Sequence, residues 1–404
     1  MVSLTSQAKQ KIREILSKAA ESKATPGLVF GATSVEKELY FANAGPRVFG
    51  EPSSDPITED NIFWICSQTK LIVSIAVLQL VERGKLQLDE PVSRILPELA
   101  NPIIVEGRFY DKDSPTKPAH GEITIRQLLN HSSGLTYLRE QRDPPHHMSL
   151  AYSSKHNKDN PIGYFYSLVR EIYDSIPLKF EPGTSFDYGW GSDSLGFIIE
   201  RVTGQTLEEY FKEHIFLPLG MTSATFYLTD EVQKTAVPLS FRDKDGKLQP
   251  WADQIPLIEQ DPEKVRLHLA GIGLYSSLKD YLTLLRHLLQ VQANTADHPI
   301  LQRSSVNSFF LPTLSKDGEK ALGAMVRGQD LQWSTALCLN TYDWPGRRRK
   351  GSGCWYGWAG TYYLVDPDTG VALVFGSQVL PSQDPEVVRL WSELEEVFYA
   401  GLTK

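Results

Sequence analysis

A serine and a lysine three residues apart could form the nucleophilic centre of an acyl-transferring enzyme. Ser67 and Lys70 stand between the apolar segments 62–66 and 71–73, at the start of a long apolar helix pattern. Helical spacing places both side chains on one face, beside the free N–H groups and positive potential of the helix N-terminus. Lysine is seldom buried without a partner, and burial would lower its pKa enough for it to deprotonate a serine hydroxyl. The alternative is a capping serine followed by a lysine that extends to solvent.

The spacing alone does not select this pair, because Ser-x-x-Lys occurs five times in the chain. The other four copies are Ser6/Lys9, Ser34/Lys37, Ser114/Lys117 and Ser276/Lys279. The first and last would open helices as N-caps, with Asp280 complementing the helix dipole in the latter. The second falls in a hairpin turn, and the third lies in a proline-rich loop. Apolar sequence on both sides distinguishes the pair Ser67/Lys70 from these copies.

A proton relay is the next group that a serine enzyme needs. Tyr188 follows a Pro-Gly turn and precedes an apolar helix pattern that begins near Ser192. Its hydroxyl could pass a proton between Ser67, Lys70 and a leaving group. From the residues alone, a half-buried aromatic side chain without a chemical role is the favoured interpretation, because Tyr188 is one of 17 tyrosines.

An oxyanion hole is the third requirement, and the residues at 358–361 could supply it. Trp358-Ala359-Gly360 stand at the start of a strand pattern, where small residues let a substrate approach the backbone. The N–H of Thr361 could then act together with the N–H of Ser67. The alternative is an ordinary strand start that contains a glycine.

The elements that must position these residues come from both ends of the chain. Strand patterns are predicted at 28–35, 38–45, 361–367 and 371–378, the last two joined by the turn sequence DPDTG, and helices at 5–22 and about 385–402. We therefore predict an α/β (α+β) fold with an antiparallel sheet from both chain ends, flanked by helices. The sheet domain would comprise 1–75 and 271–404, and 76–270 would be a mostly helical inserted domain. The irregular stretch 139–161 is predicted to be a functional or disordered loop.

The composition is that of an ordinary globular chain and argues against several kinds of partner. Of the 404 residues, 41% are apolar and 22% are charged, and the formal net charge is −8. A mildly acidic chain is poorly suited to nucleic acid or an anionic membrane as its main partner. The basic run at 347–350 follows a Pro-Gly pair and is predicted to be a solvated loop in preference to a binding patch.

The cysteines and the N-terminal segment indicate a location. Cys66, Cys338 and Cys354 are widely spaced and odd in number, which favours a reducing compartment and gives no metal-ligand spacing. Residues 1–23 form a charged amphipathic pattern without a secretory h-region, and no apolar run approaches the about 18 residues of a membrane span. We predict a soluble, cytoplasmic protein.

Three motifs in order resemble those of the serine β-lactamase/penicillin-binding-protein superfamily: Ser67-x-x-Lys70, Tyr188-Gly189-Trp190 and Trp358-Ala359-Gly360. Connecting segments such as LVERGKLQLDEPV, ITIRQLLNHSSGL and GIGLYSSLKDYLTLL are similar to the class C β-lactamase-like esterases, and the resemblance spans roughly residues 8 to 400. It implies a β-lactamase/transpeptidase-like fold without cofactor or metal ion. It also implies that His131 and the helix at Ser276 are structural.

Two departures from the superfamily pattern indicate the subclass. Trp358 occupies the place of the lysine or histidine that attracts a substrate carboxylate, and losing that cation removes a charge-assisted hydrogen bond of about 1.5–3 kcal/mol. Trp190 replaces the asparagine that usually contacts a substrate amide. Both changes favour an aromatic, apolar site, and we expect Trp190, Trp358, Ala359 and Gly360 to bind substrate. Trp355 and Tyr356 would add to an apolar cleft or belong to the core.

This pattern most resembles the fungal lovastatin-type acyltransferases (transesterases). The resemblance implies that Lys70 takes the Ser67 proton, that Ser67 forms an acyl-enzyme, and that the N–H groups of Ser67 and Thr361 hold the oxyanion. Tyr188, with Lys70, would protonate the leaving group and then deprotonate the acceptor. The donor would be a small-molecule thioester or ester, with CoA or an acyl carrier protein as thioester carriers, and the acceptor a hydrophobic alcohol of a secondary metabolite, or water. The alternatives are a carboxylesterase acting on small esters, a β-lactamase or D-Ala peptidase, and a catalytically inactive scaffold.

Overall fold

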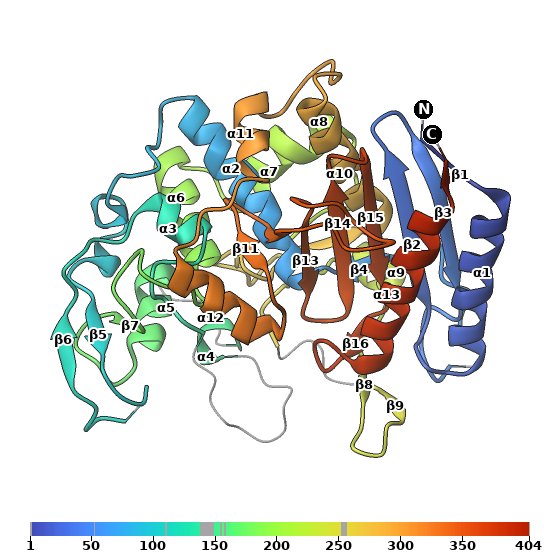
Figure 1. Cartoon of the computed structure of the whole chain (residues 1–404). Helices are drawn as coiled ribbons and strands as arrows, with labels where there is room; N and C mark the ends of the chain where they lie inside the picture. Colours follow the sequence, from blue (N-terminus) through green and yellow to red (C-terminus); the bar gives the residue numbers. More distant parts are fainter. Residues whose placement is uncertain are drawn as a thin grey trace.

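An antiparallel sheet forms the centre of the molecule (Figure 1). The computed structural model describes residues 2–51, 53–109, 111–137, 149–153, 156, 159–251 and 257–403, and within them this sheet has seven strands in the order β11-β12-β13-β14-β15-β2-β3. Their bounds are β2 Leu28–Ser34, β3 Glu38–Ala44, β11 Leu331–Trp333, β12 Cys338–Asn340, β13 Gly353–Gly357, β14 Thr361–Asp366 and β15 Val371–Gly376. Strands from the two chain ends meet where β15 pairs with β2.

Helices cover both faces of the sheet, which explains why its strands β2, β14 and β15 are buried at every position. Helices α1 (Ser6–Glu21) and α13 (Pro385–Ala400) pack together on one face, and α10 (Leu278–Gln292) lies on the other (Figure 1). The alternation along β15 shows this arrangement: Leu373 and Phe375 join the core under α1 and α13, whereas Ala372 and Val374 join the core that contains α10. The predicted sheet from both chain ends, flanked by helices, is confirmed.

Two predicted helix caps are displaced by one residue. Thr5, in place of Ser6, accepts a hydrogen bond from the Ala8 amide at the start of α1. Ser277, in place of Ser276, caps α10 through the Asp280 amide. The cap is the last residue with extended backbone before the helix, and the sequence offered two adjacent hydroxyl residues at both sites.

The middle of the chain combines short helices, short strands and loops, and it packs around α2 (Thr69–Glu82), which is buried from Thr69 to Leu80. The other helices there are α3 Ile125–Leu129, α4 Leu150–Ser153, α5 Pro161–Arg170, α6 Gly191–Thr203, α7 Leu207–Phe211, α8 Leu217–Leu219 and α9 Asp230–Thr235; α11 Arg303–Ser308 and α12 Lys316–Val326 follow α10. Short strands form the sheets β6-β5-β7 (Thr116–Pro118, Ile103–Val105, Pro177–Leu178) and β16-β8-β9 (Val379–Leu380, Ser240–Arg242, Leu248–Pro250). Further pairs are β4 (Ile62–Trp64) with β10 (Tyr275–Ser277) and β1 (Ser3–Leu4) with β17 (Leu402–Thr403).

The domain division at 75/76 and 270/271 stays a prediction. Helix α2 runs through the first boundary, and β8 of the central segment pairs with β16 from the C-terminal part. Most of the predicted loop at 139–161 lies outside the described residues, which include within it α4, His156, residues 159–160 and the first residue of α5.

The prediction of a solvated basic run at 347–350 is wrong for Arg348. Its side chain is only 3% exposed and forms two hydrogen bonds of 2.7 Å with the buried carboxylate of Glu395 in α13, which Arg347 also contacts. The partner lies 47 residues later in the chain, so the sequence run alone did not reveal it.

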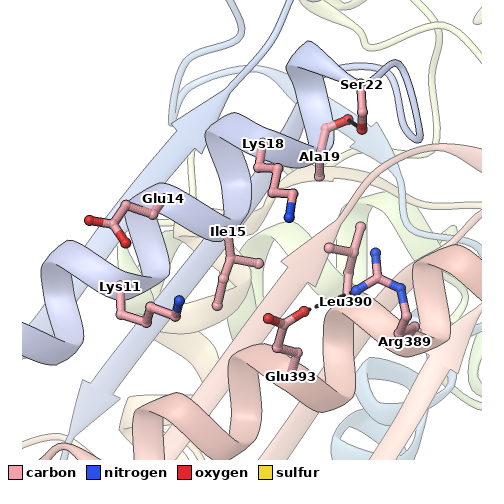
Figure 2. A pocket seen from close by; sticks show the side chains of 9 residues that line it. All are labelled: Lys11, Glu14, Ile15, Lys18, Ala19, Ser22, Arg389, Leu390 and Glu393. Atoms are coloured by element: carbon pink, nitrogen blue, oxygen red, sulfur yellow. Dashed lines mark hydrogen bonds and ion pairs between the residues drawn. The ribbon is translucent and has the colours of Figure 1, made fainter.

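A surface groove between α1 and α13 is shown in Figure 2. Charged side chains of both signs line it, among them Lys11, Glu14, Lys18, Arg389 and Glu393. These helices cover the face of the sheet opposite α10, so the groove is separated by the sheet from the core around α2 and Ser67.

Candidate active site

Ser67 and Lys70 meet where strand β4 passes through the 3-10 turn η1 (Cys66–Gln68) into α2. Lys70 Nζ lies 3.3 Å from Ser67 Oγ and donates a 2.7 Å hydrogen bond to the Gly271 carbonyl. Ser67 is 9% exposed and Lys70 is 3% exposed. The structure therefore brings the predicted nucleophile and base into contact at the start of a buried helix.

The turn before Ser67 is held in an unusual conformation. Cys66 has a φ of +47°, in the left-handed region that residues with a Cβ seldom adopt. Its carbonyl accepts a 2.6 Å hydrogen bond from the Thr69 hydroxyl, and its thiol contacts the backbone amides of Trp358 and Ala359. Strain of this kind persists only where surrounding contacts fix it, so the position of Ser67 is set by the neighbouring turn as well as by its own helix.

The electrostatic environment of Lys70 lowers the pKa of its side chain. Burial lowers the pKa of its ammonium group to about 8, and the negative charge of Asp193 partly opposes this shift. A substantial fraction of Lys70 is then neutral in mildly alkaline solution, which is the form that can accept the Ser67 proton.

Tyr188 lies directly beside this pair. Its hydroxyl accepts a 2.8 Å hydrogen bond from the Trp355 indole N–H. Lys70 Nζ is 4.6 Å from the centroid of the Tyr188 ring. Burial raises the pKa of Tyr188 well above its usual value, so the neutral phenol, and not a phenolate, is the form present around pH 7.

The third predicted segment approaches the nucleophile through a close backbone contact. A Cβ on Gly357, at the end of β13, would lie 2.6 Å from the Ile65 carbonyl oxygen, so only glycine allows this approach. Gly360 has a φ of +76°, and a Cβ there would lie 2.9 Å from Ser377 Oγ. Thr361 follows at the start of β14 and is fully buried.

Gln378 is a residue that sequence reasoning missed. Its side-chain oxygen accepts the Trp64 amide at 3.1 Å, and its side-chain nitrogen donates to the carbonyls of Trp64 at 3.2 Å and Ala359 at 3.4 Å. It therefore fastens the strand before Ser67 to the turn at 358–360. A single buried amide after a strand carries no local signal, so only the structure could identify it.

Asp193, in the first turn of α6, is a second missed residue. It is fully buried, and its carboxylate accepts hydrogen bonds from the Gly271 amide at 2.8 Å and the Tyr152 hydroxyl at 2.7 Å. Burial raises the pKa of Asp193, while the charge of Lys70 opposes this effect. A Cβ on Gly271 would lie 2.6 Å from Asp193 Oδ2, which explains the glycine. The available signal was an acidic residue inside the apolar pattern GWGSDSLGF.

A chain of phenols extends from Asp193 back to Lys70. The Tyr152 hydroxyl shares a 2.9 Å hydrogen bond with the Tyr137 hydroxyl, and the Tyr137 ring centroid is 5.6 Å from Lys70 Nζ. Lys70 is therefore surrounded by two aromatic rings, one carbonyl and one buried carboxylate, which together define its position and charge.

Trp190 does not lie where the sequence interpretation placed it. Its side chain is 0% exposed and packs edge-on against the rings of Tyr137 at 4.7 Å and Tyr152 at 4.9 Å. It precedes α6 and points into the core, so it supports these phenols and presents no surface to a substrate. The expectation that Trp190 binds substrate is corrected accordingly.

Trp358 keeps part of its surface exposed and belongs to an aromatic cluster. Its ring centroid lies 5.9 Å from that of Trp64 and 6.2 Å from that of Trp251. Ala359 is buried, so beside the nucleophile this segment offers mainly its backbone and the Trp358 ring. Trp355 is 5% exposed and serves the site through its hydrogen bond to Tyr188.

His131 is buried beside the site, with its ring centroid 4.7 Å from that of Tyr188. Burial, together with the charge of Lys70, keeps the pKa of His131 well below its usual value, so the ring is neutral. Across the described ranges, no group of three or more His, Cys, Asp or Glu side chains is arranged to hold a metal ion. The described helices include none that is long and apolar enough to cross a bilayer.

A serine and a lysine at the mouth of a buried helix, set against a hairpin of an antiparallel sheet with helices on both faces, define the class of serine β-lactamase-like enzymes. The family model named Beta-lactamase matches residues 12–397, and the chain belongs to this family. This confirms the resemblance seen in the three motifs.

Individual relatives narrow the class. Monacolin J acid methylbutanoyltransferase of Aspergillus terreus is 28% identical over 411 residues, covering 95% of this chain and 94% of that protein. Lovastatin esterase of Penicillium rubens is 35% identical over 289 residues, covering 70% and 68%. Unliganded simvastatin synthase from Aspergillus terreus superposes with a TM-score of 0.82 at 25% identity, covering 98% of this chain and 99% of that one. The chain is an enzyme with acyltransferase or esterase activity.

Proposed function

We propose that the chain is a serine acyltransferase that forms an acyl-enzyme on Ser67. It would transfer the acyl group from a thioester or ester to an alcohol of a hydrophobic secondary metabolite, or to water. The observation that carries this proposal is the 3.3 Å hydrogen bond from Lys70 Nζ to Ser67 Oγ, with the centroid of the Tyr188 ring 4.6 Å from the same nitrogen. The names of the relatives, a methylbutanoyltransferase and an esterase of lovastatin, support the reaction class and the kind of acceptor.

The first half-reaction is acylation. Neutral Lys70 takes the proton of the Ser67 hydroxyl as its oxygen attacks the acyl carbonyl. The tetrahedral intermediate collapses when the C–S or C–O bond to the leaving group breaks, and the proton passes from Lys70 through the neutral Tyr188 phenol to the leaving sulfur or oxygen. The second half-reaction runs the same relay in reverse, with the acceptor hydroxyl losing its proton to the Tyr188–Lys70 pair.

We propose that the N–H groups of Ser67 and Thr361 hold the oxyanion during both steps. The support is the close approach of Gly357 to Ile65 and the Gln378 hydrogen bonds, which bring the 358–361 segment against the nucleophile turn. Removing one donor from such a site typically lowers kcat by about 10²–10³-fold.

The proposed substrate is apolar near the reacting carbon. Trp358 stands in a cluster with Trp64 and Trp251, and the position that carries a cation in penicillin-targeting enzymes carries this ring instead. An aromatic wall of this kind favours an aliphatic acyl chain or a hydrophobic alcohol over a carboxylate. We propose a small-molecule donor, with CoA or an acyl carrier protein as thioester carriers, and no nucleic-acid or membrane partner. The three free cysteines suit a cytoplasmic location.

The test is intact-mass spectrometry after mixing the full chain with a short-chain acyl thioester or p-nitrophenyl ester. We expect a single acyl adduct that maps to Ser67 and is absent in Ser67→Ala. Ser74→Ala is a matched control, because Ser74 lies one turn after Lys70 on α2 and its hydroxyl donates a 2.8 Å hydrogen bond to the Lys70 carbonyl. The proposal fails if wild type forms no adduct or if Ser67→Ala forms the same one.

A carboxylesterase is the second candidate, and the lovastatin esterase relative favours it. Both candidates share the acylation half, so the lifetime of the trapped acyl-enzyme with and without added hydrophobic alcohols separates them. Rapid loss of the adduct to water, unaffected by any alcohol, would identify a hydrolase. Ordinary turnover of a chromogenic cephalosporin would instead indicate a β-lactamase. If a fluorophosphonate probe does not label the chain at Ser67, the protein is an inactive scaffold.

A further inference from the structure

Two cysteines that the acyl-transfer chemistry does not use face each other across neighbouring strands. Cys338 on β12 and Cys354 on β13 are direct partners in the antiparallel register, and both are free thiols. Directly opposed residues in such a pair have Cα atoms about 4.5–5.5 Å apart, within the about 4.4–6.8 Å that a disulfide spans. Because the two residues stand directly opposite each other, their side chains also leave the same face of the sheet.

The surroundings of Cys354 favour its thiolate. The neighbouring thiol of Cys338 lowers the pKa of Cys354, and the positive charge of Arg348 acts in the same direction against the opposing effects of burial and of Glu395. Paired hydrogen bonds to Glu395 fix the Arg348 guanidinium group in place. Cys354 is partly exposed and Cys338 is buried, so the two thiols are unequal in reactivity and in access.

Cys66 provides a comparison within the same chain. It is fully buried, and burial raises the pKa of its thiol far above the usual value despite its contacts with the 358–359 amides. Neither of the other cysteines is its partner in the strand register. A thiol in this state is chemically inert.

We propose that Cys338 and Cys354 form a redox-active dithiol site, which a peroxide or a low-molecular-weight disulfide converts into an interstrand disulfide. With hydrogen peroxide, the Cys354 thiolate attacks one oxygen, the O–O bond breaks, and the product is a sulfenic acid and, after proton uptake, water. The Cys338 sulfur then attacks the Cys354 sulfur, the S–O bond breaks, and the Cys338 proton leaves with the oxygen as a second water. Two thiols are oxidised by two electrons, and one peroxide is reduced to two waters.

Oxidised glutathione can accept the same two electrons in place of the peroxide. The Cys354 thiolate attacks one glutathione sulfur and releases a glutathione thiolate, which leaves a mixed disulfide. Cys338 then attacks the Cys354 sulfur and releases the second glutathione. In both routes Cys354 is the attacking residue and Cys338 the resolving residue.

The disulfide would clamp β12 to β13 at the residue before Trp355. Side chains alternate along a strand, so Trp355 leaves the opposite face, where its indole holds the Tyr188 hydroxyl. The modification site is thus one residue from Trp355, the residue that holds Tyr188, and the strand separates the two side chains. Its formation does not depend on the acyl-transfer function.

The test uses the full reduced chain, treated under native conditions with hydrogen peroxide or oxidised glutathione, then denatured, alkylated and peptide-mapped. We expect Cys338 and Cys354 to lose alkylation together and to appear in one disulfide-linked peptide within a monomer, while Cys66 stays alkylated. Dithiothreitol should restore both thiols. The proposal is overturned if both cysteines stay alkylated, or if the disulfide involves Cys66 or joins two molecules.

Two single variants test which cysteine attacks the oxidant and which one resolves the intermediate. In Cys338→Ser, Cys354 should be trapped by dimedone as a sulfenic acid after peroxide, or as a glutathione adduct after oxidised glutathione. In Cys354→Ser, we expect oxidation of Cys338 to be slower than that of Cys354 by about tenfold or more, since its thiol is buried. Equal reactivity of the two single variants would refute the assigned order. The wild-type map needs no substitution, so a variant that fails to fold leaves the test intact.

Discussion

The charge of Asp193 should set the pH range in which Lys70 acts as a base. Asp193→Asn keeps the side-chain shape and an oxygen that can accept the Gly271 amide, and its amide group can donate to the Tyr152 oxygen. It removes the negative charge that raises the pKa of Lys70 against burial. Without this charge the pKa of Lys70 falls below its wild-type value of about 8, so the neutral base is present at lower pH.

The size of the expected pKa shift of Lys70 follows from the distance between Lys70 and Asp193, which both contact Gly271. Asp193 accepts the N–H of this residue and Lys70 donates to its carbonyl, so the two charges are separated by roughly one residue. At about 6–8 Å and an effective dielectric constant of about 20, their interaction is about 2–3 kcal/mol, or about 1.5–2 pH units. Because burial also raises the pKa of Asp193 and lowers its ionised fraction at acidic pH, this shift is an upper bound.

The assay is the pH profile of kcat/KM for a p-nitrophenyl ester between about pH 5 and pH 10, whose acid limb reports the free-enzyme pKa of the base. We expect the acid limb of Asp193→Asn to move to lower pH by up to about two units. Asp280→Asn is the control. Asp280 lies in the first turn of α10, where its carboxylate accepts a hydrogen bond from the Ser223 hydroxyl. This substitution should leave the acid limb in place. An unchanged limb, or a shift to higher pH, would refute the assignment of Lys70 as a base under the field of Asp193.

Three further substitutions test the supports of the site. Gly360→Ala should lower kcat/KM by about tenfold or more, because alanine is strained at a φ of +76° and its Cβ would lie 2.9 Å from Ser377 Oγ; steady-state kinetics measure this. Trp190→Ala should lower the free energy of unfolding by about 3–5 kcal/mol through the cavity left in the core, as urea unfolding would show. Glu395→Gln should lower it by about 3–5 kcal/mol, because Arg348 is left buried without its counter-charge; denaturation at pH 7 measures this.

Matched controls separate these effects from general damage. Gly246→Ala has a similar φ of +78° but no neighbour within 4 Å of the added Cβ, so kcat/KM should stay unchanged. Glu393→Gln removes an exposed ion pair from the same helix as Glu395 and should cost about 1 kcal/mol or less. Equal losses in a variant and its control would contradict the specific role assigned to Gly360 or to Glu395.

The parts of the fold that the sequence predicted are those that depend on local patterns. The apolar run of β15 and the turn DPDTG need only near neighbours: Asp366 accepts the Thr369 amide at 3.0 Å, and Gly370 adopts a φ of +73°. The pair Ser67/Lys70 could also be predicted from local sequence, because the continuous apolar sequence of α2 indicates that this helix is buried on all sides.

The parts that the sequence did not predict depend on partners far apart in the chain. Asp193 and Gly271 are 78 residues apart, and Gln378 reaches Trp64 across 314 residues. Neither contact leaves a periodic or spaced pattern. The misplacement of Trp190 has a different cause, since a motif position fixes where a residue stands along the chain but not which way its side chain points from a turn.

The electrostatics of the site support the role in substrate choice that we propose for Trp358. Lys70 is buried beside Ser67, and its positive charge is compensated by Asp193 and directed to the Gly271 carbonyl. That cation is committed to the nucleophile, so a substrate carboxylate would need a second cation at the position where Trp358 stands. The ring there packs with Trp64 and Trp251, and burying an unpaired carboxylate against such a wall is unfavourable. Binding energy must then come from apolar contact with the acyl chain or the alcohol, which is the selectivity that a hydrophobic acyl acceptor requires.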